Sequence, residues 1–165
     1  MAKSRRQLTH LNSEGSCRMV DVSSKAVTRR EAVASAHVQV GAEALSAIVS
    51  GTMPKGDVFA VARVAGITAA KKTSELIPLC HALPIDAVEV EIVAKRPDAV
   101  LITATARTVA RTGVEMEALT AAGVAALAVY DMCKSITKDI RIGPIQLESK
   151  TGGKSGPYRR IRKLK

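Results

Sequence analysis

Hydrophobic and polar residues alternate along several stretches of the chain, and a period of two predicts β-strands with one buried face. The clearest stretch is 30–40, where every second residue is apolar: Ala32, Ala34, Ala36, Val38 and Val40. Similar alternation at 88–92 and 100–106, on either side of the turn sequence 95–98, predicts a β-hairpin. A last strand is predicted over 139–148, broken at Gly143-Pro144.

Helices are predicted between these strands. A short helix over 41–50 is ended by Gly51, and a longer one runs from an N-cap at Asp57 to about Ile77, before Pro78. The segment from Val114 to about Ile136 is apolar almost all round, which predicts a helix buried on more than one side. The order β-α-β-β-α-β from residue 30 predicts an α+β, ferredoxin-like fold with helices on one face of an antiparallel sheet. A helix buried on several sides of so small a domain also indicates an oligomer.

The charge of the chain is concentrated at its two ends. The 165 residues carry a net charge of +10, and residues 1–6 and 150–165 hold the whole excess without a single acidic side chain. We therefore predict a flexible N-terminal arm over 1–18, a single ferredoxin-like domain over 19–150, and a Gly-rich segment with a basic tail over 151–165.

Several classes of protein fit the composition poorly. Three cysteines without CxxC spacing argue against a disulfide framework or a zinc site. The longest apolar run, 121–130, is far shorter than the roughly 20 residues that span a bilayer. The basic N-terminus lacks the apolar stretch of a secretory signal, so we expect a cytoplasmic protein without a membrane partner.

One candidate pair lies near the end of the long helix. Asp131 and Lys134 are three residues apart and share a helix face. A solvated surface pair is the ordinary interpretation. The alternative is a partly buried pair beside apolar neighbours, in which burial would shift both pKa values toward neutrality and suit proton transfer.

Other candidates lie elsewhere on the chain. Glu115 and Glu117 open the long helix, where acidic residues also simply favour the helix dipole. Glu117 and Asp131 lie about 21 Å apart along that helix at 1.5 Å per residue, so a site using both is shared between subunits. Lys55 precedes a helix N-terminus, a position that suits phosphate or is merely exposed. His81 lies in a proline-bounded loop, where a structural role is the common one.

Longer strings are more specific than these single residues. In unbroken order over about 8–156, the chain resembles the MoaC family of molybdenum cofactor biosynthesis. The matching strings are 8–12 (LTHLN), 19–23 (MVDVS), 55–59 (KGDVF), 76–81 (LIPLCH), 112–120 (TGVEMEALT), 130–134 (YDMCK) and 150–156 (KTGGKSG).

The resemblance implies a ferredoxin-like homohexamer, a trimer of dimers with active sites at subunit interfaces. It also implies a lyase that converts a cyclised dihydro-GTP to cyclic pyranopterin monophosphate and releases pyrophosphate. By resemblance, Asp131 is the catalytic acid/base, with Lys134 and Lys55 as catalytic lysines. The implied substrate-binding residues are Leu79, Cys80, His81, Met116, Glu117, Glu115, Arg30, Lys71 and Lys154. The resemblance implies no required cofactor and no metal ligand, and it leaves open whether Mg²⁺ accompanies the triphosphate.

Two other functions fit the same element order. An RNA-binding module would suit the basic ends, but such sheets stack bases on aromatic side chains and the predicted strands contain none. Nucleic acid is therefore not an expected partner. A non-catalytic domain that binds a small regulatory molecule is distinguished from the enzyme only by Asp131, Lys134 and Lys55.

Overall fold

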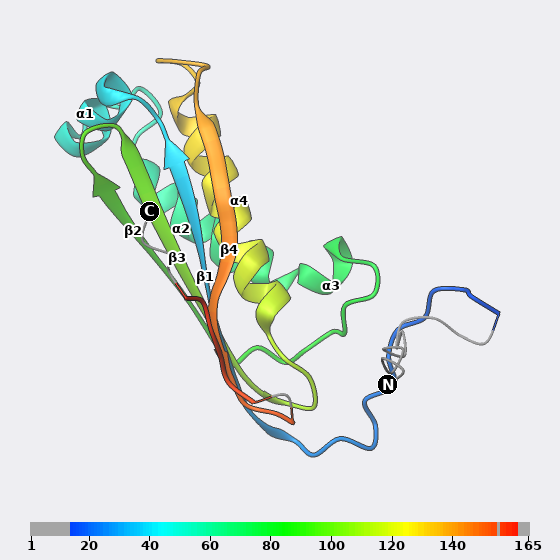
Figure 1. The fold of residues 1–165 in the computed structure, drawn as a ribbon. Helices are drawn as coiled ribbons and strands as arrows, with labels where there is room; N and C mark the ends of the chain where they lie inside the picture. Colours follow the sequence, from blue (N-terminus) through cyan, green and yellow to red (C-terminus); the bar gives the residue numbers. More distant parts are fainter. Residues whose placement is uncertain (1–13, 155, 162–165) are drawn as a thin grey trace, which may run out of the picture.

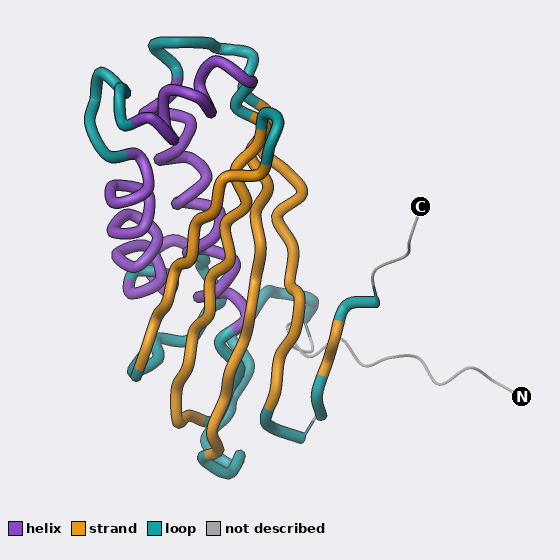
Figure 2. Tube along the Cα trace, turned by 90° about the vertical axis from the view of Figure 1, so that its left-hand side faces the viewer, coloured by secondary structure: helices purple, strands orange, loops and turns teal. Residues whose placement is uncertain are grey.

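The computed structural model describes residues 14–154 and 156–161, and a five-stranded antiparallel sheet forms its centre (Figure 1). Across the sheet the strands are ordered β2-β3-β1-β4-β5. Their bounds are β1 Thr28–Gln39, β2 Ala87–Lys95, β3 Ala99–Ala110, β4 Arg141–Thr151 and β5 Tyr158–Arg159. The helices are α1 Ala42–Ser50, α2 Val58–Lys71, α3 Thr73–Leu76 and α4 Glu115–Cys133. They lie on one side of the sheet (Figure 2), which confirms the predicted α+β class.

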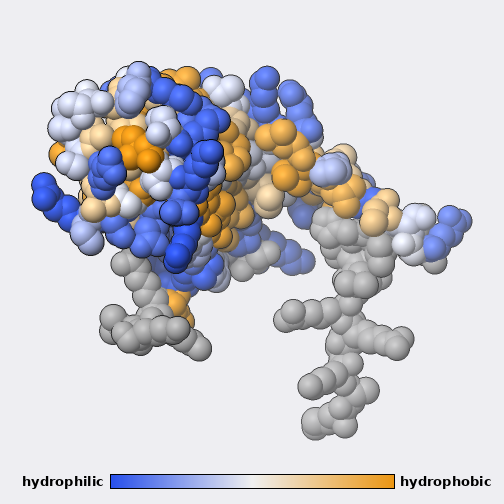
Figure 3. All heavy atoms as spheres, turned by 90° about the horizontal axis from the view of Figure 1, so that it is seen from above, coloured by the Kyte–Doolittle hydropathy of each residue, from blue (hydrophilic) through white to orange (hydrophobic). Residues whose placement is uncertain are grey.

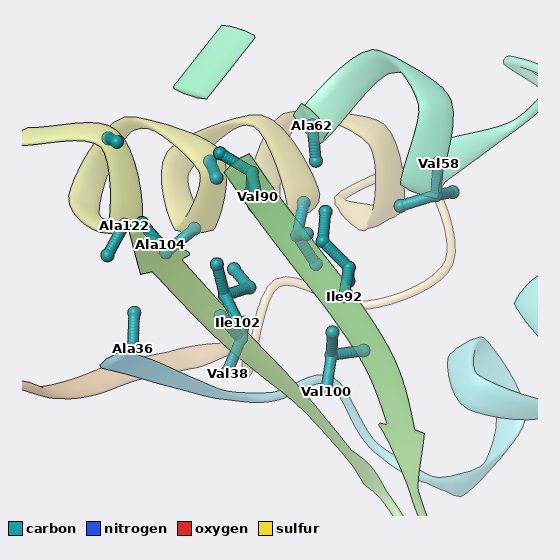
Figure 4. Packing of buried hydrophobic residues seen from close by; sticks show 14 of the residues in the cluster. Ala36, Val38, Val58, Ala62, Val90, Ile92, Val100, Ile102, Ala104 and Ala122 are labelled. Carbon is teal, nitrogen blue, oxygen red and sulfur yellow. The ribbon is translucent and has the colours of Figure 1, made fainter. Parts of the chain in front are cut away.

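The core lies between the sheet and the helices. Alternate side chains of β1 and β3 point toward α2 and α4, as the period of two predicts (Figure 4). Ala36, Val38, Val100, Ile102 and Ala104 are fully buried there. Small side chains therefore let the helices approach the sheet closely, and a few branched residues fill the remaining space.

Helices α2 and α4 pack closely against each other, with no bulky side chain between their backbones at Gly66. A Cβ atom added at Gly66 would lie 2.8 Å from the Ala121 carbonyl oxygen and 3.2 Å from Ala125 Cβ. Because α4 contacts both the sheet and α2, two of its sides are buried, as predicted. Its outward side is not covered, and Leu127 there is 59% exposed.

Helix α4 is also the one helix of the described residues that is long and apolar enough to cross a membrane. Half of the apolar 18-residue stretch of this helix is buried inside the domain, as in the core helix of a soluble protein. Seen from the end at which α1 lies, hydrophobic residues reach the surface between hydrophilic ones (Figure 3).

The single helix predicted from Asp57 to about Ile77 is wrong at its C-terminal end. Lys72 has a non-helical backbone and separates α2 from α3. The Thr73 hydroxyl donates to the Ala70 carbonyl oxygen at 2.9 Å, so a side chain competes with the backbone for the last helical carbonyls. Asp57 caps α2 as predicted, and its carboxylate accepts the Ala60 N–H at 2.9 Å.

The last strand also differs from its prediction. β4 continues through Gly143-Pro144, and β1 accommodates the extra residue by a register shift between Ala36 and Val38. Beyond β4, Tyr158 and Arg159 form β5, which pairs with Lys150 and Ser149. Part of the segment expected as a basic tail is therefore an edge strand, and this strand contains an aromatic residue.

Candidate active site

Asp131 lies between two lysines in the last turn of α4. Its Oδ1 atom is 2.6 Å from Lys134 Nζ, and its Oδ2 atom is 3.0 Å from Lys55 Nζ. Lys55 also donates to the Asp131 backbone carbonyl at 2.7 Å. The turn before α2 brings Lys55 to the C-terminal end of α4, where two cations suit the negative end of the helix dipole. The three residues predicted to be catalytic thus form one cluster.

The charges of this cluster differ from the expectation of a partly buried pair. The side chains of Asp131 and Lys134 are 56% and 50% exposed in the single chain. Hydrogen bonds from Lys134, then Lys55, lower the pKa of Asp131, and the hydrogen bond to Asp131 raises the pKa of Lys134. Of the two alternatives, the single chain shows the exposed pair, and the shift of both pKa values toward neutrality is contradicted because pairing in an exposed position favours both charged forms. The resting cluster is a carboxylate held between two ammonium groups.

Glu117 has the opposite surroundings, at the other end of α4. Its side chain is only 2% exposed, and its Oε2 atom has no hydrogen-bond partner. Its Oε1 atom accepts from the Cys80 thiol at 3.8 Å. Burial raises the pKa of Glu117, and burial followed by the nearby Glu117 charge raises the pKa of Cys80. A buried carboxyl with an unused oxygen can accept a ligand N–H or hold a proton.

The loop before β2 carries the other predicted binding residues of this end. Nε2 of His81 is 2.8 Å from the Val20 carbonyl oxygen, which can only accept, so Nε2 is the donor in this bond. This bond ties the segment before β1 to the loop. Leu79 and Met116 are 38% and 37% exposed.

A cavity of about 750 Å³ lies where β1, β4 and the loop before α4 meet. Arg30, Glu115 and Lys154, all predicted to bind substrate, line it, whereas Lys71 at the end of α2 does not. The Glu115 carboxylate accepts from Lys150 Nζ at 2.7 Å. The prediction of Lys71 as a phosphate ligand has no support from this cavity.

The cavity has further lining residues, of which Lys25, Thr28 and Arg111 were not found from the sequence. Lys25, Thr28, Arg111 and Lys150 line the same space, and Thr28 Oγ1 is buried without a hydrogen-bond partner. They come from the segment before β1 and its first residue, from the residue after β3 and from the end of β4, so no local motif joins them. Only the antiparallel register, which pairs Thr28 with Ala110, brings these segments together.

Two chemically different centres therefore occupy the two ends of α4. The cavity near Glu115 is lined by five cationic side chains, and the buried carboxyl of Glu117 lies two residues further along the chain. Asp131 and its two lysines lie outside the cavity lining. The first arrangement suits a polyanionic small molecule, and the second suits proton transfer and charge stabilisation. Within the described residues, no group of three or more His, Cys, Asp or Glu side chains is placed to hold a metal ion. The fold and the two sites together define the class of the protein: a small α+β enzyme that acts on an anionic substrate.

The comparison with known proteins agrees with this class. The sequence profile of the MoaC family matches residues 19–153. A cyclic pyranopterin monophosphate synthase from Brevibacillus brevis is 53% identical over 154 residues, covering 93% of this chain and 96% of that protein. The chain belongs to the MoaC family.

Proposed function

We propose that this chain is a cyclic pyranopterin monophosphate synthase of molybdenum cofactor biosynthesis. It converts the cyclised dihydro-GTP to cyclic pyranopterin monophosphate and releases pyrophosphate. The observation that carries the proposal is the 53% identity to a synthase along nearly the whole chain. The cluster of Asp131 with Lys55 and Lys134 supports it, because a merely regulatory binding domain does not require a carboxylate held between two ammonium groups.

The triphosphate binds in the cavity beside β1 and β4. Arg30, Lys150 and Lys154 line this space and supply positive charge toward phosphate oxygens. The formation of a cyclic monophosphate breaks the bond between the α- and β-phosphates, so negative charge develops on the departing pyrophosphate. Fixed cations stabilise that charge without having to reorganise.

The ring of the substrate lies toward Glu117 and the 79–81 loop. The unpartnered Oε2 atom of Glu117 accepts an N–H of the guanine-derived ring, and its raised pKa also lets it exchange a proton. The Cys80 thiol contacts Glu117 at this position, and His81 follows it in the same loop, fixed by its bond to Val20. Leu79 and Met116 supply the apolar contacts of this subsite.

Asp131 and the two lysines transfer protons during ring opening and closure. Asp131 starts as the base, because its lowered pKa keeps it a carboxylate, and Lys134 starts as the acid, because its raised pKa keeps it an ammonium. Lys55 holds the carboxylate from its second oxygen and keeps it at the end of α4.

Both centres act on one substrate only if two subunits contribute to each site. They are separated by about 21 Å along α4 at 1.5 Å per residue, and Leu127 is exposed on the outward side between them. A two-fold axis beside this side would place Glu117 of one subunit near the other subunit's copy of Asp131. We propose such dimers, three of which form a hexamer.

Neither a protein-bound metal nor a cofactor is part of the proposal. The triphosphate itself is a ligand for Mg²⁺, so the assay below is run with and without added Mg²⁺. Cytoplasmic action fits a nucleotide-derived substrate and cysteines at positions 17, 80 and 133 that are all free.

The test is turnover of the cyclised dihydro-GTP by the purified full chain, followed by pyrophosphate release and detection of the pterin product. Asp131→Asn and Lys134→Ala should fold and lose about 10²–10⁴-fold in kcat, the usual contribution of a positioned acid or base. Lys138→Ala, which removes another exposed lysine four residues beyond Lys134, is the control and should keep full activity. Product formation at the wild-type rate by both cluster variants would contradict these roles, and failure of the wild type to turn over would contradict the function.

A further inference from the structure

Two consecutive glycines follow β4 and lie against the beginning of β1. Gly152 and Gly153 have φ angles of +90° and +79°, a region that side chains other than glycine's rarely adopt. A Cβ atom at Gly153 would collide with the Arg30 guanidinium, 2.6 Å from its Cζ atom and 3.0 Å from Nη2. A Cβ atom at Gly152 would collide with the Arg29 carbonyl oxygen and lie 3.0 Å from Arg30 Cδ. The glycine backbone therefore lies directly against the Arg30 side chain.

The Arg30 side chain makes one hydrogen bond here, and its buried Nε donor has no partner. The bond is donated by its Nη2 atom to the Arg111 carbonyl oxygen, at 3.3 Å. The Thr28 hydroxyl is buried without a partner as well, and both residues line the 750 Å³ cavity. Two buried polar groups without partners on one wall favour the binding of a ligand that accepts hydrogen bonds, because leaving them unpaired is costly.

We propose that Gly152 and Gly153 are positioning residues, whose missing side chains let the Arg30 guanidinium pack against the end of β4 and donate to an anion in the cavity. The Thr28 hydroxyl is a second donor for the same anion. The ligand class is a phosphate chain, and its identity as the triphosphate of the substrate rests on the proposed function. The glycines act through Arg30 and do not touch the reacting atoms.

A turn alone would also explain glycines with positive φ, and the chain supplies a control for that explanation. Gly156 has a φ of +69°, but a Cβ atom there would meet nothing within 4 Å. Gly156→Ala therefore carries the backbone strain without the collision. Gly153→Ala introduces both the backbone strain and the collision. The Arg30 guanidinium is the free end of a flexible side chain, so it would move away from its place in the cavity.

The experiment measures the binding of inorganic tripolyphosphate to the full chain by calorimetry, with no turnover required. Gly153→Ala should weaken this binding about tenfold or more, the size of a lost hydrogen bond to a charged group, and Gly156→Ala should leave it within twofold. With the natural substrate, Gly153→Ala should raise KM by a similar factor and also lower kcat, because the displaced Arg30 guanidinium no longer stabilises the charge on the departing pyrophosphate.

A double-mutant cycle then separates positioning from folding. Arg30→Ala should weaken tripolyphosphate binding, and adding Gly153→Ala to it should cause no further loss, because the glycine acts only through Arg30. If Gly153→Ala alone does not fold, the double variant should fold, since the collision is gone.

The inference would be overturned if the losses of tripolyphosphate affinity in the cycle were additive, or if Gly153→Ala and Gly156→Ala lost equal affinity. It would also be overturned if the wild type did not bind tripolyphosphate. A double variant that fails to fold alongside an unfolded Gly153→Ala would overturn it too. A non-additive cycle in a protein that does not turn over the cyclised dihydro-GTP would contradict the proposed function and leave this inference standing.

Discussion

The buried carboxyl of Glu117 makes stability depend on pH in a direction that can be worked out. Its folded pKa is raised above its ordinary value of 4.5, mainly by burial, so the folded chain binds the proton more tightly than the unfolded chain. Between these two pKa values the unfolded state carries fewer protons, and stability falls as pH rises. The stabilisation by the neutral carboxyl is complete below the ordinary value and is lost once pH passes the folded pKa.

Glu117→Gln removes this dependence and keeps the shape of the side chain. The free energy of unfolding of the variant relative to wild type should increase from pH 4 to pH 8 by about 1.4 kcal/mol for each unit by which burial raises the pKa. In a chain of this size, each kcal/mol corresponds to roughly 2–4 °C in Tm. The assay is thermal unfolding at fixed protein concentration across that pH range, because subunit association also affects Tm.

Glu91→Gln, which removes an exposed carboxyl from β2, is the matched control for the substitution itself and should follow the wild-type profile. The reasoning is refuted if Glu117→Gln tracks wild type at all pH values, or if its relative stability declines as pH rises.

Other predictions concern packing and the charged sites. Gly66→Ala should destabilise the domain by about 1–3 kcal/mol in denaturant unfolding despite better helix propensity, because its Cβ would lie 2.8 Å from a backbone oxygen of α4; an unchanged midpoint would contradict the close approach. Ile102→Ala, at a fully buried position, should cost about 2–5 kcal/mol in the same assay, and a cost below 1 kcal/mol would contradict the core assignment. Lys150→Ala should raise KM for the triphosphate substrate with a smaller effect on kcat, and the salt dependence of KM should weaken; an unchanged KM would exclude Lys150 from the cavity's anion site.

The regular parts of the fold were predictable because their signals are local. The alternation at 30–40 coincides with β1, and the hairpin and the long apolar helix lie where the pattern places them. The break at Lys72 was not predictable from periodicity, because it depends on the Thr73 hydroxyl bonding to the preceding turn. The continuity of β4 through Pro144 was missed because the pairing of β4 with β1, which takes up one extra residue of β4 between Ile142 and Ile145, is a tertiary feature.

The candidate site divides in the same way. The three-residue spacing of Asp131 and Lys134 predicts their contact, and helix geometry alone shows that Glu117 lies too far from Asp131 for one small ligand. The meeting of Lys55 with Asp131 and the cavity beside Thr28 depend on contacts distant in sequence. The directions of the pKa shifts could not be predicted, because they depend on how far each side chain is exposed, and the spacing of residues in the sequence does not show this.

The central claim is that one active site uses Asp131 from one subunit and Glu117 from the other. Its most direct test mixes Asp131→Asn with Glu117→Gln, each inactive alone, under conditions in which subunit exchange is demonstrated. Random two-fold pairing makes half of the dimers mixed, with one intact site of two, so pyrophosphate release should recover to about a quarter of the wild-type rate. Mixtures that exchange subunits and stay inactive would show that each site is built within one chain.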